Sequence, residues 1–263
     1  MESEFIMANW SDPRATGPRV AAAPRAADPL EGVRVPTTGA AVRDAGLRKY
    51  MLSVYNYMAS GVLLSGIVAL LFASSGLAGQ VFGQPGILKY VIIFAPLLMV
   101  FAFGSVVSRG STAAVAAMFW AFAAVMGLSL SAVMLIYDGA QIAQAFFATS
   151  AAFVGLSLYG YTTKKDLSGF GTFLIMGVIG LVVAMLLNLF LQSSVLNFVI
   201  SGVGVLIFAG LTAYDTQRIK SLYFQVAGSD MMGKTAIMGA LSLYLDFVNM
   251  FQFLLSFMGG NRD

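Results

Sequence analysis

The sequence predicts an all-α, polytopic membrane protein with seven transmembrane helices. Of its 263 residues, 59% are hydrophobic and only 10% are charged, and the mean hydropathy is +0.84. A soluble globular domain carries about 25% charged residues, so lipid is the expected solvent for most of this chain. The apolar residues also fall into runs of about 20, the length that crosses roughly 30 Å of hydrocarbon as a helix.

Residues 1–49 differ from the rest of the chain and predict a disordered, cytoplasmic arm. They are rich in Ala, Pro, Gly and Arg and contain no sustained apolar period, a composition that does not support a packed core. They also lack the apolar segment of a signal peptide. Met7 would serve as a start, which would make residues 1–6 an addition from cloning. The membrane domain is expected over residues 50–263.

Apolar segments of membrane-spanning length follow in order from residue 50. We expect helices over residues 51–73, 87–107, 113–136, 140–162, 169–192, 195–217 and 237–258. Turn-forming residues separate them at 83–86 (Gly-Gln-Pro-Gly), 138–139 (Asp-Gly) and 164–166 (Lys-Lys-Asp). Only Gln192, Ser193 and Ser194 separate the fifth segment from the sixth, so six spans is the alternative count.

The positions of Lys and Arg predict the orientation, because positively charged loops stay on the cytoplasmic side. If the N-terminus is inside, all but two of the 15 Lys and Arg residues fall on the cytoplasmic side, and the exceptions are Lys89 and Arg262. We therefore expect a cytoplasmic N-terminus and an external C-terminus. The same bias favours an odd number of spans. The short chain and short arm favour the bacterial inner membrane.

The composition excludes several classes of function. With no Cys and no His, the chain has no thiolate nucleophile and no imidazole base, which excludes serine–histidine hydrolysis and zinc proteolysis of the HExxH type. The pI of 9.2 does not indicate nucleic-acid binding, because the basic residues lie at predicted helix ends and not on one folded face. The sequence also has no Walker loop. We expect neither an enzyme nor a bound cofactor.

Two aspartates fall within apolar sequence and are the candidate functional residues. A carboxylate at membrane depth costs a few kcal/mol and usually faces a bundle interior, a partner or a water-filled path. Asp246 lies inside the last predicted span and shares a helix face with Ser242 and Asn249, which together form a polar stripe. Asp215 lies near the cytoplasmic end of the sixth span, with Arg218 as a local ion-pair partner at i+3.

The two aspartates would form a pH-sensitive site if they meet. Repulsion between like charges and loss of hydration would favour one shared proton, so the pair could sense pH without histidine. Its oxygens could also contact Ca²⁺, although two carboxylates do not supply the six to eight ligands that this ion takes. The alternative is structural: Asp215 pairs with Arg218 at the interface, and Asp246 bonds to neighbouring helices. Arg109, at the end of the second span, could reach a carboxylate or extend to lipid phosphate.

Two segments resemble a known family. Residues 214–220 (Tyr-Asp-Thr-Gln-Arg-Ile-Lys) and residues 240–255 (Ala-Leu-Ser-Leu-Tyr-Leu-Asp-Phe-Val-Asn-Met-Phe-Gln-Phe-Leu-Leu) are similar to the signature of the Bax inhibitor-1 family, in its bacterial branch. Residues 127–133 (Gly-Leu-Ser-Leu-Ser-Ala-Val) also resemble the family's third span. The resemblance covers roughly residues 45–263 and leaves out the N-terminal arm.

The resemblance implies both an architecture and a function. It implies a bundle of seven helices with the last, least apolar helix at its centre. It also implies a pH-sensitive Ca²⁺ leak, in which an aspartate of the sixth helix and one of the seventh form a hydrogen-bonded gate. By motif these are Asp215 and Asp246. The family pairs an arginine of the second helix with the sixth-helix aspartate, and Arg109 is the only arginine of this sequence near that helix.

Three hypotheses of different classes follow. The leading one is a passive, pH-gated Ca²⁺ (cation) leak, for which membrane lipid, Ca²⁺ and protons are the partners. The second is a non-transporting regulator that binds a membrane-bound ATP-dependent protease, or another membrane partner, because one bacterial member of the family restrains such a protease. The third is an intramembrane aspartyl protease. It is disfavoured because the second aspartate of that class follows Gly-x-Gly, whereas Asp246 follows Leu-Tyr-Leu.

Overall fold

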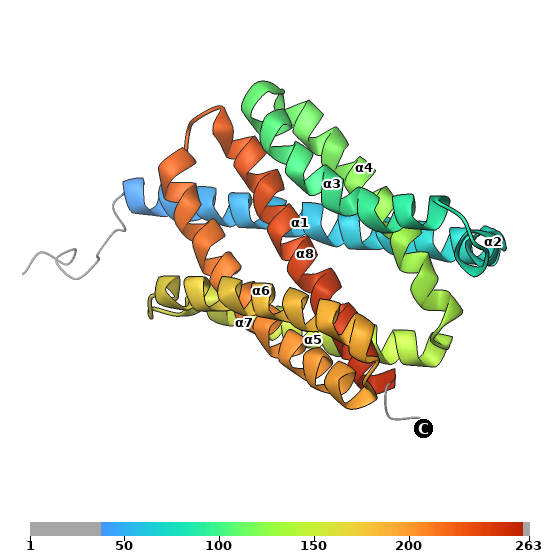
Figure 1. Cartoon of the computed structure of the whole chain (residues 1–263). Coiled ribbons are helices and arrows are strands. Elements are labelled where there is room, and N and C mark those ends of the chain that lie inside the picture. The colour runs from blue at the N-terminus through green and yellow to red at the C-terminus, as the bar shows by residue number, and fades with distance from the viewer. Residues whose placement is uncertain (1–37, 260–263) are drawn as a thin grey trace, which may run out of the picture. The chain divides into compact units, whose positions relative to one another are not determined.

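The described part of the chain, residues 38–259, is almost entirely helical (Figure 1). A computed structural model gives its secondary structure, with side chains described from Val42 onward. The helices are α1 (Thr38–Ser74), α2 (Leu77–Gly83), α3 (Leu88–Arg109), α4 (Thr112–Leu130), the short 3₁₀ helix η1 (Ser131–Leu135), α5 (Gly139–Thr162), α6 (Ser168–Leu191), α7 (Ser194–Val226) and α8 (Met231–Gly259). Residues 43–259 belong to one compact unit.

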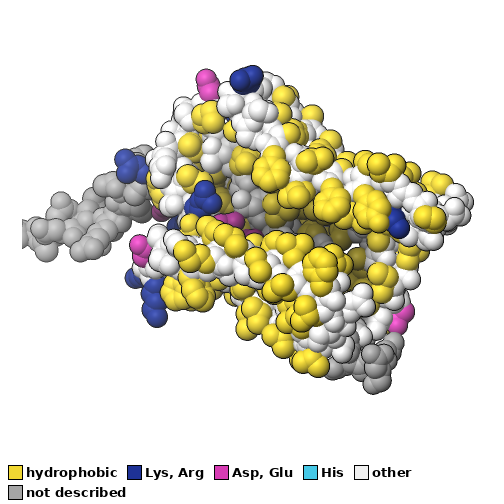
Figure 2. Space-filling model, in the orientation of Figure 1, with side chains coloured by type: hydrophobic (Ala, Val, Ile, Leu, Met, Phe, Trp, Pro, Cys, Tyr) yellow, Lys and Arg dark blue, Asp and Glu magenta, His cyan; other side chains and the backbone are white. Residues whose placement is uncertain are grey.

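Seven of these helices are long and apolar enough to cross a membrane, which confirms the predicted all-α class and the count of seven. Within residues 38–259 there is no β-strand. The large apolar side chains on the outer faces of the helices are exposed (Figure 2), as for Phe190 on α6, which is 83% exposed. Water does not tolerate apolar surface on this scale, whereas lipid does. The chain is a membrane protein.

Local side-chain chemistry explains where several helices begin and end. Asp138 caps α5 with a reciprocal pair of hydrogen bonds: the Gln141 backbone N–H donates to Asp138 Oδ1 at 2.9 Å, and the Asp138 N–H donates to Gln141 Oε1 at 3.1 Å. The close junction between the fifth and sixth spans is a tight turn. Gln192 adopts a left-handed conformation with φ of 48°, and the Ser193 hydroxyl then caps α7.

Three helix boundaries differ from the prediction. Residues 38–49, which we assigned to the N-terminal arm, are part of α1. The other residues of the arm, 1–37, lie outside the described chain, and so does Arg262. The helix α7 continues past residue 217 to Val226, and α8 begins at Met231 instead of residue 237. Hydropathy marks only the part of a helix that lies in the hydrocarbon layer, whereas the helix itself can extend beyond that layer into water. The short elements α2 and η1 were not predicted.

The last helix, α8, lies at the centre of the unit, as the family resemblance implies. In its most apolar stretch 61% of the residues are buried, against 33% or less in every other span, and its mean hydropathy of 1.4 is the lowest of the seven. It packs against α7 and α5 on one side and against α4 on the other (Figure 1). A polar side chain on α8 is therefore surrounded by protein, whereas one on the outer helices would face lipid.

Candidate functional site

Asp246 is buried at the centre of the unit. It lies on α8, is 5% exposed, and follows the fully buried Tyr244 by two residues. Its Oδ2 atom is buried and has no hydrogen-bond partner among the described residues. A buried carboxylate without partners is costly, since desolvation is not offset by a hydrogen bond. Such a group is retained where a proton, an ion or a second titratable group acts on it.

Asp215 is that second titratable group. It lies on α7, is half-buried, and acts electrostatically on Asp246 across the helix pair. The two helices run antiparallel in close contact: the glycine at 239 packs on Ile219, and the glycine at 204 packs on the ring of Phe253. In this register α7 presents residue 215 to the middle of α8. The structure therefore places the two predicted aspartates on neighbouring stretches of α7 and α8, where the charge of one acts on the other.

The two arginines that we considered as ion-pair partners differ in position. Arg218 lies one turn beyond Asp215 on α7 and is the cation that acts on that carboxylate. Its side chain is exposed, as is that of Arg109 at the end of α3. Arg109 is not among the charges that act on either aspartate. The end of α3 meets α8 instead through Lys234, whose Nζ donates to the carbonyl of Val107 at 3.2 Å.

The polar stripe on α8 does not bond to Asp246. The Asn249 side-chain amide donates to the carbonyl of Leu245 in its own helix at 2.8 Å, and Ser242 is half-buried. Both share the helix face of Asp246 by spacing, but neither donates to its carboxylate. The carboxylate thus has Asp215 as its electrostatic neighbour and no side-chain donor on its own helix.

Buried hydroxyl groups lie on α5 and α7, and the sequence did not single them out. Thr216, the residue after Asp215, is fully buried and its Oγ1 lies 3.5 Å from Ser157 Oγ on α5. Thr149, about two turns before Ser157 on α5, is also fully buried, and its Oγ1 has no partner within the described chain. Serine and threonine are common in apolar helices, so only the position of Thr216 next to Asp215 connects these hydroxyls with the acidic pair.

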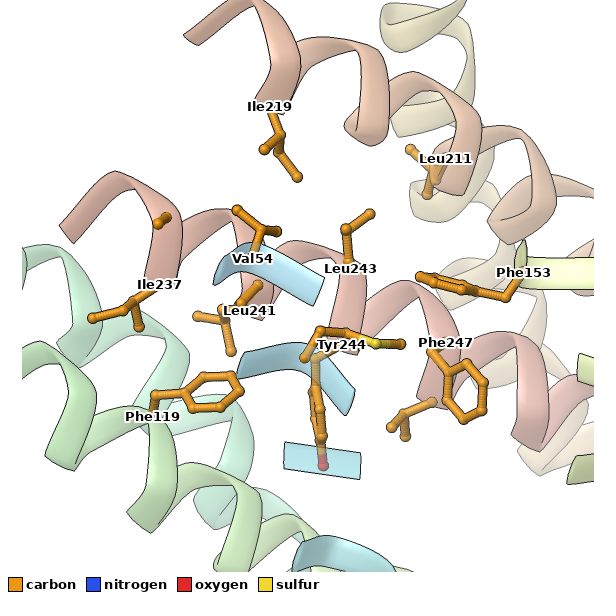
Figure 3. Packing of buried hydrophobic residues seen from close by; sticks show 14 of the residues in the cluster. Val54, Phe119, Phe153, Leu211, Ile219, Ile237, Leu241, Leu243, Tyr244 and Phe247 are labelled. Carbon is orange, nitrogen blue, oxygen red and sulfur yellow. The ribbon is translucent and has the colours of Figure 1, made fainter. Parts of the chain in front are cut away.

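A second polar contact ties α8 to the other side of the unit. The Tyr244 and Ser65 hydroxyls share a hydrogen bond of 2.6 Å, and Ser65 Oγ also donates to the carbonyl of Ala123 at 2.6 Å. The Tyr244 ring contacts Phe119 and Phe122 edge to face, with centroids 6.1 and 5.6 Å apart. Figure 3 shows this ring pointing from α8 toward α1. Helices α1, α4 and α8 are therefore joined at one buried point.

The site has no donor set for a resident metal ion. Within residues 38–259, no group of three or more His, Cys, Asp or Glu side chains comes together. Two carboxylates provide fewer oxygens than a Ca²⁺ shell requires.

Comparison with known proteins gives the family. The sequence model of the family described as "Inhibitor of apoptosis-promoting Bax1" matches residues 47–263. The chain belongs to the Bax inhibitor-1 family. The match includes both aspartates and all of the last six spans, and it confirms the resemblance carried by residues 214–220 and 240–255.

Several bacterial proteins are similar to this Bax inhibitor-1 protein over most of their length. An uncharacterised protein of Caulobacter vibrioides is 48% identical over 84% of this chain and 92% of its own. The inner membrane protein YbhL of Escherichia coli K12 is 40% identical over 83% of this chain and 94% of its own. The uncharacterised membrane protein SpyM3_0260 of Streptococcus pyogenes is 37% identical over 83% of this chain and 95% of its own.

Proposed function

We propose that this Bax inhibitor-1 protein is a passive, pH-sensitive cation leak in the bacterial inner membrane, with Ca²⁺ as the permeant ion. The observation that carries the proposal is the buried Oδ2 of Asp246, which has no hydrogen-bond partner in the described chain and lies under the electrostatic influence of Asp215. A purely structural carboxylate in a membrane would be expected to have its hydrogen bonds satisfied by neighbouring helices.

The aspartate pair acts as the gate in this proposal. When the pair holds a proton, one carboxyl group donates to the other, the mutual repulsion is removed, and α7 and α8 stay closely packed. When the proton leaves, two negative charges face each other in an apolar bundle, which favours separation and the entry of a cation. Flux therefore increases as pH rises. No energy source is involved, so the ion moves down its gradient.

The basic end of the unit supports the orientation of the protein with its N-terminus in the cytoplasm. Arg109, Lys164, Lys165, Arg218, Lys220 and Lys234 lie at helix ends or in the turns between them. Hydrogen bonds join these ends: Lys220 Nζ donates to the carbonyl of Tyr161 at 2.7 Å, and Gln217 donates to that of Lys165 at 2.8 Å. The positive-inside rule favours a cytoplasmic location for this basic end, and the name of the similar protein YbhL supports an inner-membrane location.

The proposal is tested by Ca²⁺ flux into proteoliposomes that contain the full chain and a trapped Ca²⁺ indicator. We expect flux above that of empty vesicles, and we expect it to change in Asp215→Asn and Asp246→Asn but not in Asp230→Asn, a matched change at the exposed turn between α7 and α8. Absence of flux from folded protein would contradict the proposal. That result would favour the non-transporting regulator, and a pull-down of a membrane-bound protease would then test it.

A further inference from the structure

An apolar groove runs between α1 and α5 and is separate from the aspartate pair. Three adjoining cavities of about 500, 480 and 490 Å³ form it. The first and second share Val62, Gly66, Leu70, Phe146 and Phe247 in their walls. The second and third share Tyr55, Phe153 and Val154. The cavities are therefore segments of one continuous groove, with α1 and α5 as its walls and Phe247 of α8 in its floor.

The groove is as long as the hydrocarbon layer is thick. On α1 it extends from Arg48 to Leu70, which is about 33 Å at 1.5 Å per residue, close to the roughly 30 Å of a bilayer core. In its floor the rings of Phe153 and Phe247 pack edge to face, with centroids 5.6 Å apart (Figure 3). The acyl chain of one lipid reaches about half of this thickness, so it fits the half of the apolar groove nearest its own headgroup.

One end of the groove is positively charged. Arg48 lines that end together with Tyr161, and Lys220 adds a second cation beside it, with its Nζ 4.8 Å from the centroid of the Tyr161 ring. Asp44, one turn before Arg48 on α1, is the nearest acidic residue along that helix. The mouth thus combines cations with an apolar channel, which is the pattern of a site for an acidic lipid headgroup between helices.

We propose that this groove binds an anionic phospholipid of the surrounding membrane, with the phosphate at Arg48 and an acyl chain along Tyr55, Phe153 and the α8 floor. The bound chain contacts Phe247 of α8, the residue next to Asp246, so the lipid lies one residue from the buried carboxylate. The binding itself does not depend on the proposed leak activity.

The proposal is tested by the lipids that the full chain retains. The protein is reconstituted in vesicles of equal parts phosphatidylcholine and phosphatidylglycerol, extracted in mild detergent and analysed by native mass spectrometry. We expect retained lipid with a preference for phosphatidylglycerol. Arg48→Gln lowers that preference about fivefold, the effect of one basic residue near an anionic headgroup. Arg43→Gln, an exposed arginine on the same helix outside the groove, leaves it unchanged.

A second pair of variants distinguishes lipid bound in the groove from lipid bound elsewhere on the membrane-facing surface. Ala59, an exposed alanine in the wall of the middle cavity, is replaced by Phe to fill the groove, and we expect the retained lipid to be lost. Ala102→Phe, an equally exposed change on α3, keeps it. Equal retention in these two variants, or equal lipid preference in the two arginine variants, would overturn the proposal. So would a dimer that dissociates in Ala59→Phe, because a second copy would then occupy the groove.

Discussion

The Tyr244 hydroxyl on α8 lies 2.6 Å from the Ser65 hydroxyl on α1, and the two share a buried hydrogen bond. Asp246 follows Tyr244 by two residues, which places it about 200° around the helix at 3.6 residues per turn. The central helix is thus anchored to α1 and α4 on one face and carries the aspartate on the other. If α8 moves at the aspartate pair, the hydrogen bond between Tyr244 and Ser65 holds its opposite face in place.

Removing the Tyr244 hydroxyl tests this anchor. In Tyr244→Phe the ring contacts stay, while Ser65 keeps its bonds to the carbonyls of Gly61 and Ala123. We expect a loss of about 0.5–1.5 kcal/mol in the free energy of unfolding, the usual contribution of one hydrogen bond. Reversible unfolding in mixed micelles measures it. Tyr159→Phe, at an exposed tyrosine on α5, serves as control, and equal stability in the two variants would contradict the assignment.

Close contact between α5 and α7 depends on Gly160. A Cβ atom at this position would overlap the backbone carbonyl of Ala213, which cannot move without shifting α7. We expect Gly160→Leu to destabilise the fold by about 1–3 kcal/mol through overpacking. Gly155→Leu on the same helix is the matched control, because a Cβ there has open space around it. Unfolding midpoints in detergent compare the two. A Gly160→Leu variant as stable as Gly155→Leu would disprove the close approach.

The turn before α6 contains Asp166, whose side-chain hydrogen bonds determine the direction of its pKa shift. Asp166 Oδ1 accepts hydrogen bonds from the Ser168 hydroxyl at 2.5 Å and from the Ser168 backbone N–H at 2.9 Å. These bonds, the hydroxyl first, lower the pKa of Asp166 below its ordinary value. A lowered folded-state pKa means that the contribution to stability is present above the unfolded-state pKa and is lost as pH falls through the folded-state value.

Ser168→Ala removes the stronger of the two bonds, so the pKa of Asp166 should rise toward its ordinary value. Carbon-13 NMR of aspartate-labelled protein measures the carboxyl titration directly. Thr163→Ala removes a different hydroxyl from the same turn, one that accepts from the Lys165 N–H, and should leave the pKa of Asp166 unchanged. An unaltered titration in Ser168→Ala would show that the hydroxyl does not set this value.

The sequence predicted the membrane class, the seven spans and the two candidate aspartates for one physical reason. Lipid penalises polar groups, so apolar length marks the spans, and a carboxylate inside a span stands out. The end of α7 and the start of α8 were missed because Arg218 and Lys220 on α7, and Lys234 on α8, lower the hydropathy without interrupting the helix. Hydropathy therefore gave the number of membrane spans correctly but not the bounds of these two helices.

Contacts between distant helices could not be predicted from the sequence. Ser65 and Tyr244 are separated by 179 residues, and neither type is unusual in an apolar helix. The choice between Arg109 and Arg218 also depended on packing, since spacing alone offered both. The groove between α1 and α5 has no sequence signal, because its apolar wall residues cannot be distinguished from those that face bulk lipid.

The ratio of Ca²⁺ flux at pH 8 to that at pH 6, in wild type and in Asp246→Asn, tests the aspartate gate most directly. The account predicts higher flux at pH 8 in wild type, by up to about tenfold per pH unit for one proton, and a ratio near one in Asp246→Asn. Asp230→Asn should keep the wild-type ratio. A folded Asp246→Asn protein that keeps the full wild-type pH response would contradict the account.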